Sequence, residues 1–371
     1  MAGSRSPTAR RPSAIASRSR RASQSDSPPA GASAALSWRK SDPDGMDRSD
    51  GTSLDLGTGP LCGQSDDMST AATATDGTGA PGDQHPAPLQ DSGHVHGRSD
   101  HSPRYVHGYS EHETRRLTDQ AETLAALLHA GTAYPAGSRV LEAGCGVGAQ
   151  TVHLAASSPG AHITAVDISA ASLARARDRL ATRPHAATVH WQQADLTDLP
   201  YPDASFDHLF VCFVLEHLPD PAQALTGLRR VLRPGGSITV IEGDHGSAFF
   251  HPDSAHARAA IGHQVRLQAA AGGNALLGRE VQPLLTAAGY ADVTVRPRTV
   301  YADATRPGLV DGFTRNTFIA MVASVRDDAL AAGLTTEAEW DRGIRDLRRT
   351  AEEGGTFHYT FFKGTAVNPA G

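Results

Sequence analysis

Apolar and polar positions follow a regular pattern only in the later part of the chain, after about residue 100. There, short apolar runs alternate with segments whose apolar residues recur at helical spacing. The runs predict strands at 140–143, 162–167, 187–191, 206–212 and 237–242, and the spaced segments predict helices at 149–157, 170–182 and 221–232. Because strands that alternate with helices favour a parallel sheet, we expect one covered by helices on both faces.

Three further features surround this alternating part. Ser110 and Glu113 have the spacing of a capping box and precede apolar residues at helical spacing, which predicts a leading helix. Two helical insertions are expected at about 245–278 and 300–355, the first containing a helix at Ala255–Ala271, and the strand-like His358–Lys363 comes last. Long connections are usually functional, so the insertions are the expected lid and acceptor pocket.

The first part of the chain has a different composition. Residues 1–102 are rich in Ser, Arg, Ala, Gly, Pro and Asp and show almost no apolar periodicity, so we predict a disordered extension before a folded domain at 103–371. Its first 25 residues contain six arginines and no acid, but they lack amphipathic spacing and interleaved aromatic residues. A dispensable extension is therefore favoured over a transit peptide or a nucleic-acid contact.

Charge and apolar runs narrow the class of protein. The net charge of −6 argues against a surface for nucleic acid or anionic membrane. No apolar run is long enough to span a bilayer. Three cysteines cannot form a disulfide framework, and the irregular histidines between 85 and 112 do not have zinc-site spacing. We expect a cytoplasmic protein, monomer or homodimer, with no metal, nucleic acid or membrane partner.

Glycines follow the first predicted strand and suggest a ligand. Gly144 and Gly146, with Ala149, allow a sharp turn and close approach of a ligand at a helix start that favours anionic groups. Asp167 ends the second strand about twenty residues later, where a carboxylate can accept both ribose hydroxyls. These features fit a nicotinamide dinucleotide and S-adenosyl-L-methionine equally well.

Later landmarks separate these two cofactors. Asp195 follows the third strand, Glu216 and His217 follow the fourth, and Leu232-Arg-Pro-Gly-Gly236 precedes the fifth. In this order and spacing the set resembles the class I S-adenosyl-L-methionine-dependent methyltransferases. The resemblance implies an α/β, Rossmann-like, seven-stranded and mostly parallel sheet with helices on both faces, an antiparallel last strand, and S-adenosyl-L-methionine as cofactor.

The resemblance also implies roles for individual residues. Glu142 and the turn at Gly144, Cys145 and Gly146 would hold the methionine and ribose portion. The remaining cofactor candidates are Asp167 for the ribose, Ile168 against adenine, Asp195 and Leu196 at the adenine amino group, Val211 at the methionine end, and Tyr105 before the leading helix.

Catalytic candidates come from the same rim. Glu242, Asp244 and His245 follow the fifth strand among aromatic residues, which suits a flat acceptor with one ionisable N–H or O–H. His217 and Tyr109 are further candidates for the base, although a satisfied loop network would explain the acids and histidines equally well. Candidates for binding the acceptor are Phe213, Phe249, Arg315, Asn316 and Tyr359.

The expected acceptor is a small aromatic molecule of natural-product type. The segments Tyr105–Ser110, Glu242–Gly246 and Tyr359–Lys363 are similar to microbial methyltransferases, some of which methylate indole C3 in tryptophan-derived compounds such as cyclic dipeptides. Two alternatives stay open, namely methyl transfer to the oxygen or nitrogen of a phenol, quinone or amine, and a silent cofactor-binding regulator.

Overall fold

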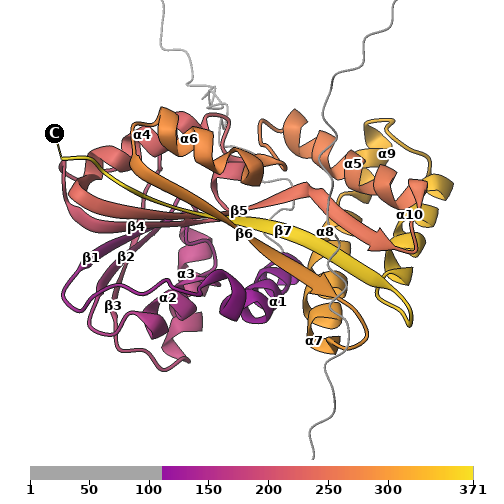
Figure 1. Cartoon of the computed structure of the whole chain (residues 1–371), viewed down its shortest axis with the longest axis horizontal. Coiled ribbons are helices and arrows are strands. Elements are labelled where there is room, and N and C mark those ends of the chain that lie inside the picture. Colours follow the sequence, from indigo (N-terminus) through magenta and orange to yellow (C-terminus); the bar gives the residue numbers. More distant parts are fainter. Residues whose placement is uncertain (1–110, 371) are drawn as a thin grey trace, which may run out of the picture. The chain divides into compact units, whose positions relative to one another are not determined.

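The computed structural model describes residues 111–370. The predicted extension at 1–102 and the candidates Tyr105, Tyr109 and Ser110 lie outside these residues. Figure 1 shows one mixed sheet with strand order β3-β2-β1-β4-β5-β7-β6. Its strands are β1 Arg139–Ala143, β2 His162–Asp167, β3 Thr188–Gln193, β4 Phe206–Cys212, β5 Leu232–His251, β6 Ala291–Ala302 and β7 Thr356–Val367.

The pairing of the strands confirms the predicted fold class. Strands β1 to β5 pair in parallel, whereas β7 pairs antiparallel with both β5 and β6. The helices and short turns between them are α1 Glu111–Leu128, α2 Thr151–Ser157, α3 Ala170–Ala181, η1 Leu215–His217, α4 Pro221–Val231, α5 Ala255–Ala270, η2 Leu277–Glu280, α6 Val281–Ala287, α7 Pro307–Leu309, η3 Val310–Ile319, α8 Ala320–Ser324, α9 Arg326–Ala331 and α10 Glu337–Arg349.

Helices cover both faces of the sheet (Figure 1), with α1, α2 and α3 on one face and α4 and α6 on the other. Neighbouring residues of one strand point to opposite faces, so Val140 belongs to the apolar core beneath α1 while Leu141 belongs to the core beneath α4. Helix starts are fixed locally, since the side chains of Ser169 and Asp220 accept from backbone N–H groups of α3 and α4. The alternation predicted for this half is therefore confirmed.

The fifth strand is longer than predicted. Instead of ending near Glu242, β5 continues to His251, and its second half pairs with β7 from Gly243↔Phe361 to His251↔Thr356, with an irregularity after Asp244. Its partner strand lies more than a hundred residues away in the chain, so local periodicity could not reveal the pairing. The segment 245–251 is thus strand rather than helical insertion, and β6 likewise extends to Ala302 before the second helical segment begins.

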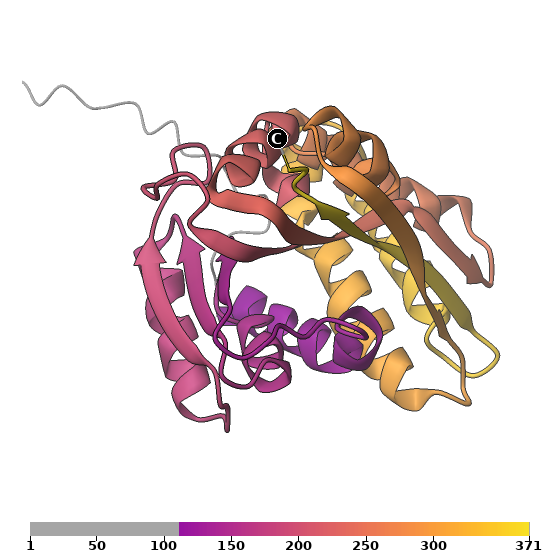
Figure 2. The ribbon, with the colours of Figure 1, turned by 60° about the vertical axis from the view of Figure 1, so that its left-hand side comes forward.

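The extended strands and the two helical segments form the part of the molecule beyond β4. Figure 2 shows α1 running beside the later helical segment, and α1 contacts η3. The element η3 is a π-helix, a rare conformation that is frequent at functional sites. Helix α5 packs on α10, α9 and α8. Within residues 111–370, no helix is both long and apolar enough to cross a membrane.

Candidate cofactor and acceptor site

The glycine turn after β1 is held by backbone hydrogen bonds. The N–H groups of Gly144 and Cys145 donate to the carbonyl of Val166, and Gly144 has a φ of +74°. A Cβ at Gly144 would lie 2.6 Å from the Val214 side chain, so only glycine lets the exit of β4 approach this turn. Gly146, with φ +52°, has nothing within 4 Å of where its Cβ would stand. The turn therefore presents bare backbone to open space.

Asp167 stands at the end of β2 beside this turn. Its carboxylate accepts from the backbone N–H of Gly146 at 2.8 Å and of Ser169 at 2.9 Å, one bond on each oxygen. Each oxygen keeps a further lone pair. The next side chain, Ile168, is 44 % exposed although it is large and apolar. A carboxylate with spare acceptor capacity beside an uncovered apolar side chain suits a ribose with an attached base.

The remaining adenine candidates follow β3. Asp195 is exposed, and its Oδ1 accepts from the backbone N–H and the hydroxyl of Thr197. Leu196 is buried beside it. Val211 is fully buried on β4 together with Cys212, so only their backbone can face a ligand. These positions agree with the predicted edge, while their roles stay predictions.

A buried carboxyl group lies beneath the glycine turn. Glu142 is 2 % exposed, and its Oε2 atom has no hydrogen-bond partner. Burial raises the pKa of Glu142 to about 7. An unpaired acceptor in this place fits a ligand that brings a donor, as the amino group of S-adenosyl-L-methionine would. The turn, Asp167, Ile168 and Glu142 therefore fit that cofactor.

Glu242 fixes the backbone that directly follows β4. Its Oε1 atom accepts from the backbone N–H groups of Val214 at 3.1 Å and Leu215 at 2.9 Å, at the start of η1. Phe213, just before, has φ +58°, which is rare for an aromatic residue and marks a constrained turn. Burial and the neighbouring Glu216 raise the pKa of Glu242 well above its usual range. Glu242 thus fixes the backbone at the start of η1, and its role as a base stays a prediction.

His245 lies at the centre of the acceptor end. It is 6 % exposed, its Nδ1 lies 2.9 Å from the hydroxyl of Tyr359, and its Nε2 lies 3.2 Å from the sulfur of Met321. Burial lowers the pKa of His245 to about 4, so the ring is neutral near pH 7. A Cβ on Gly243 would come within 2.4 Å of the Tyr359 hydroxyl, so the glycine is what allows tyrosine and histidine to meet.

Asp244, predicted as an alternative base, has a different position. Its two oxygens accept from Nε and Nη2 of Arg279 at 2.7 and 2.8 Å, and Oδ1 also accepts from the backbone N–H of Gly246. A two-pronged guanidinium contact of this kind is strong and fixes the orientation of the carboxylate. Asp244 is thus bound by Arg279, and its role as a base stays a prediction. The sequence did not indicate Arg279 as its partner.

A second polar group lies below η1. Glu216 is buried, and its side-chain Oε1 lies 3.6 Å from Nε2 of His217. Arg116 on α1 is bound in two-pronged fashion by Glu113. Burial, followed by the Arg116 charge, lowers the pKa of His217, whereas burial raises that of Glu216. Helix α1 thus brings a charged pair over the exit of β4.

The acceptor candidates do not all meet. Tyr359 touches His245, and Phe213 packs against Phe361 with ring centroids 5.4 Å apart. Phe249, however, is 61 % exposed on the continuation of β5, where its ring is tilted against that of His358 with centroids 5.4 Å apart. The pairing of β5 with β7 carries it away from the buried histidine, which argues against a role in the same pocket.

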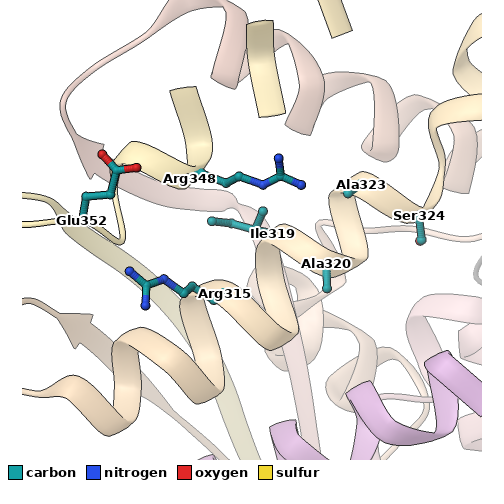
Figure 3. A pocket seen from close by; sticks show the side chains of 7 residues that line it. All are labelled: Arg315, Ile319, Ala320, Ala323, Ser324, Arg348 and Glu352. Atoms are coloured by element: carbon teal, nitrogen blue, oxygen red, sulfur yellow. The ribbon is translucent and has the colours of Figure 1, made fainter. Parts of the chain in front are cut away.

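Arg315 and Asn316 also lie apart from His245. Both are exposed on η3, and Arg315 donates to Asp311 and to the carbonyl of Ala351. Figure 3 shows Arg315 at a hollow of about 580 Å³ between η3 and the end of α10, lined also by Arg348 and Glu352. Both side chains of this pair are exposed on η3 rather than beside His245, and their role in binding the acceptor stays a prediction.

Several residues near the site were missed by sequence reasoning. Met321, Arg116, Gln264 and Gln268 are buried close to the histidine or to η1, on helices that local patterns could place only roughly. The two glutamines carry a detectable signal, because they sit one turn apart on the buried face of an alanine-rich helix. In the part of the chain that the structure describes, no cluster of three or more His, Cys, Asp or Glu could hold a metal ion.

Known proteins resemble this chain mainly over the cofactor half. Residues 141–240 match the family model described as a methyltransferase domain. An uncharacterised 37.1 kDa protein of transposon Tn4556 from Streptomyces fradiae is 36 % identical over 228 residues, which is 58 % of this chain and 64 % of that protein. The structure of YcgJ from Bacillus subtilis has a TM-score of 0.44 at 16 % identity and covers 67 % of this chain and 99 % of its own.

Two named enzymes are similar over shorter stretches. The demethylmenaquinone methyltransferase of Clavibacter sepedonicus is 43 % identical over 107 residues, covering 29 % of this chain and 42 % of that enzyme. The 27-O-demethylrifamycin SV methyltransferase of Amycolatopsis mediterranei is 37 % identical over 127 residues, covering 34 % and 44 %. The chain thus spans less than two thirds of the length of these relatives. The matched segment, the strand order and the glycine turn together establish that the chain carries a class I methyltransferase domain, whose cofactor is S-adenosyl-L-methionine.

Proposed function

We propose that this protein transfers a methyl group from S-adenosyl-L-methionine to a small aromatic acceptor of natural-product type, with an indole carbon as the favoured target. The observation that carries the proposal is the neutral, buried His245 hydrogen-bonded to Tyr359 at the acceptor end of β5. A proton acceptor in this position favours an enzyme over a protein that only binds the cofactor.

The cofactor half would hold the donor molecule. The backbone at Gly144 and Gly146, the carboxylate of Asp167 and the apolar face of Ile168 would bind its nucleoside portion, and Glu142 its amino group. When bound, the cofactor supplies an electrophilic methyl group on a sulfonium, so the protein need only align and desolvate the reactants. Glu242 contributes by fixing the backbone of Val214 and Leu215 beside the turn.

The hydrogen bonds of His245 define its proton-accepting atom. Thioether sulfur is only a weak acceptor, so Nε2 carries the proton toward Met321 and Nδ1 accepts from the Tyr359 hydroxyl. Burial keeps the pKa of Tyr359 well above its usual range, so the phenol remains protonated. A proton from an acceptor N–H or O–H would pass to the tyrosine oxygen as the tyrosine proton passes to Nδ1. This raises electron density at the attacking atom, and no oxidant is needed.

Phenols and quinones remain a second candidate class. The two named relatives are called methyltransferases of a demethylmenaquinone and a demethylrifamycin, and the His245 pair could equally accept a phenol proton. The aromatic side chains around Tyr359, which include Phe318 and Phe361 at centroid distances of 5.4 and 4.7 Å, suit any flat acceptor.

The test is mass spectrometry of the full chain incubated with deuteromethyl-labelled cofactor and a panel of tryptophan-derived cyclic dipeptides, indoles, phenols and quinones. Label on an indole carbon supports the favoured acceptor. Label on an oxygen keeps the activity and overturns the indole assignment. Binding of S-adenosylhomocysteine without label on any acceptor contradicts the proposal and supports a silent binding protein.

The role of His245 is tested with the substitution His245→Ala. We expect turnover to fall about a hundredfold, the usual size of a general-base contribution, while the affinity for S-adenosylhomocysteine is kept. His190→Ala, at an exposed position on β3, is the matched control. Unchanged turnover in His245→Ala would remove the histidine from the mechanism.

A further inference from the structure

Two glutamines on α5 form a directed chain of hydrogen bonds that starts at η1. Gln264 and Gln268 are 0 and 2 % exposed and lie one helical turn apart. The Nε2 atom of Gln268 donates to the backbone carbonyl of Glu216 at 3.1 Å, and Nε2 of Gln264 donates to Oε1 of Gln268 at 2.9 Å. This chain of hydrogen bonds therefore runs from η1, which follows β4, along α5 in the acceptor half of the molecule.

The direction of this hydrogen-bond chain follows from the chemistry of its groups. The Glu216 carbonyl can only accept, and it also accepts from the backbone N–H of Asn274 at 2.7 Å. Gln268 must therefore present its NH₂ group to this carbonyl, which leaves its oxygen toward Gln264. Gln264 must in turn present its NH₂ group to that oxygen. The free end of the chain is the amide oxygen of Gln264.

That oxygen is buried and has no hydrogen-bond partner among the described residues. A buried, unpaired amide oxygen is rarely left in a folded protein, because it has lost water without gaining a donor. The surrounding backbone is closely packed, since a Cβ on Gly273 would lie 2.5 Å from the Glu216 carbonyl and 3.1 Å from Cγ of Gln268. Rotation of the pair away from this position is therefore restricted.

The position of these two glutamines in the fold places the Gln264 oxygen on the acceptor side of the site rather than on the cofactor side. The cofactor candidates lie at the ends of β1 to β4, whereas α5 follows β5 and packs on α8, which carries Met321 against His245. Glu216, where the chain begins, also acts electrostatically on His245. We propose that the Gln264 oxygen determines acceptor specificity by accepting a hydrogen bond from an amide N–H of the acceptor, at a point apart from the methylated atom. This inference rests on the proposed function.

The experiment compares two probes whose ring amide nitrogens carry hydrogen in one and methyl in the other. Cyclo(L-Trp-L-Ala) and its counterpart methylated on both ring amide nitrogens are titrated by calorimetry into the full chain saturated with S-adenosylhomocysteine, and label transfer is measured in parallel. We expect wild type to bind the N–H probe about tenfold more tightly, the value of one well-made hydrogen bond. In Gln264→Leu this preference should disappear while S-adenosylhomocysteine affinity is unchanged.

Further variants separate recognition from packing. Gln264→Met keeps length and serves if the leucine variant does not fold, and Gln268→Leu should weaken the preference by freeing the Gln264 amide to rotate. Gln282→Leu is the matched control, because Gln282 makes a similar one-turn hydrogen bond to Thr286 on an exposed helix face. A structural role alone would lower stability without changing the ratio of the two affinities.

The outcomes separate the two proposals. Equal binding of both probes by wild type, or a preference that survives in both Gln264 variants, overturns the role of Gln264 even if label is transferred. A preference lost in the Gln264 variants, with no label transferred by wild type, supports this role and overturns the proposed transfer to these compounds. If wild type neither binds nor labels either probe, both proposals fail for amide-bearing acceptors.

Discussion

The two halves of this sheet build their sites in different ways. At the ends of β1 and β2, backbone groups and the carboxyl groups of Glu142 and Asp167 form the candidate site, and the groups that meet there belong to consecutive strands, as with Gly146 and Asp167, which are 21 residues apart. Within the second half of β5, His245 meets Met321 and Tyr359, residues 76 and 114 positions away. The comparison teaches that a common cofactor can be held by local sequence, whereas the pocket for a particular acceptor depends on distant segments.

The largest effect should come from breaking the cofactor half. In Asp167→Ala we expect the affinity for S-adenosylhomocysteine to fall at least a hundredfold, about 2.7 kcal/mol, because a carboxylate that also orders the Gly146 and Ser169 N–H groups is lost. Calorimetric titration measures it. Asp178→Ala, at an exposed position on α3, is the control. Retained affinity would show that the nucleoside binds elsewhere.

A smaller effect should come from the acceptor half. In Gly243→Ala the new Cβ would meet the Tyr359 hydroxyl at 2.4 Å and separate it from His245. We expect turnover to fall about thirtyfold, within the range of general acid–base contributions, with unchanged cofactor affinity. Gly262→Ala is the control, because nothing lies within 4 Å of its Cβ position on α5. If both variants behave alike, the tyrosine–histidine contact does not support turnover.

A third prediction concerns how the stability that Glu142 gives to the cofactor half depends on pH. The folded-state pKa of Glu142 is about 7, above its ordinary value of 4.5, so the folded chain holds a proton that the unfolded chain releases between these values. Stability from this group is complete below pH 4.5 and is lost as pH rises through 7. Glu142→Gln should thus raise the free energy of unfolding at pH 8 by about 1 to 2 kcal/mol, below the roughly 3 kcal/mol of the full shift.

Denaturant titrations at pH 5 and pH 8 measure this gain. It should be small at pH 5 and should come with weaker binding of S-adenosylhomocysteine. An equal gain at both pH values would mean that packing, and not the proton, is responsible.

The smallest expected effect concerns His245, whose pKa is about 4 in the folded chain and 6.5 in the unfolded chain. The unfolded chain therefore binds the extra proton first, and stability is lost as pH falls from 6.5 towards 4. His245→Asn should weaken this acid dependence by about 1 kcal/mol. The measurement is the free energy of unfolding at pH 5 and 7. An unchanged slope would indicate that His245 is not buried as a neutral ring.

The sequence predicts the cofactor half of the site better than the acceptor half, because only the cofactor half depends mainly on local backbone conformation. The strand ends at Ala143 and Asp167 and the glycine turn depend on local backbone conformation, which short patterns encode. The continuation of β5 depends on pairing with β7, and the partners of Asp244 and His245 come from helices whose orientation no local pattern fixes. His245 and Tyr359 were predicted as separate residues, but their contact required the fold.

One remaining contact concerns the order in which the molecule can be completed. Lys363 on β7 donates to the carbonyls of Leu128, the last residue of α1, and of Ala130, just after it, across a separation of 235 and 233 residues. A chain emerging from the ribosome has α1 available long before Lys363 exists. The helix that covers the β4 exit can therefore be fastened to the sheet only when synthesis is nearly finished, so cover and acceptor end mature together and late.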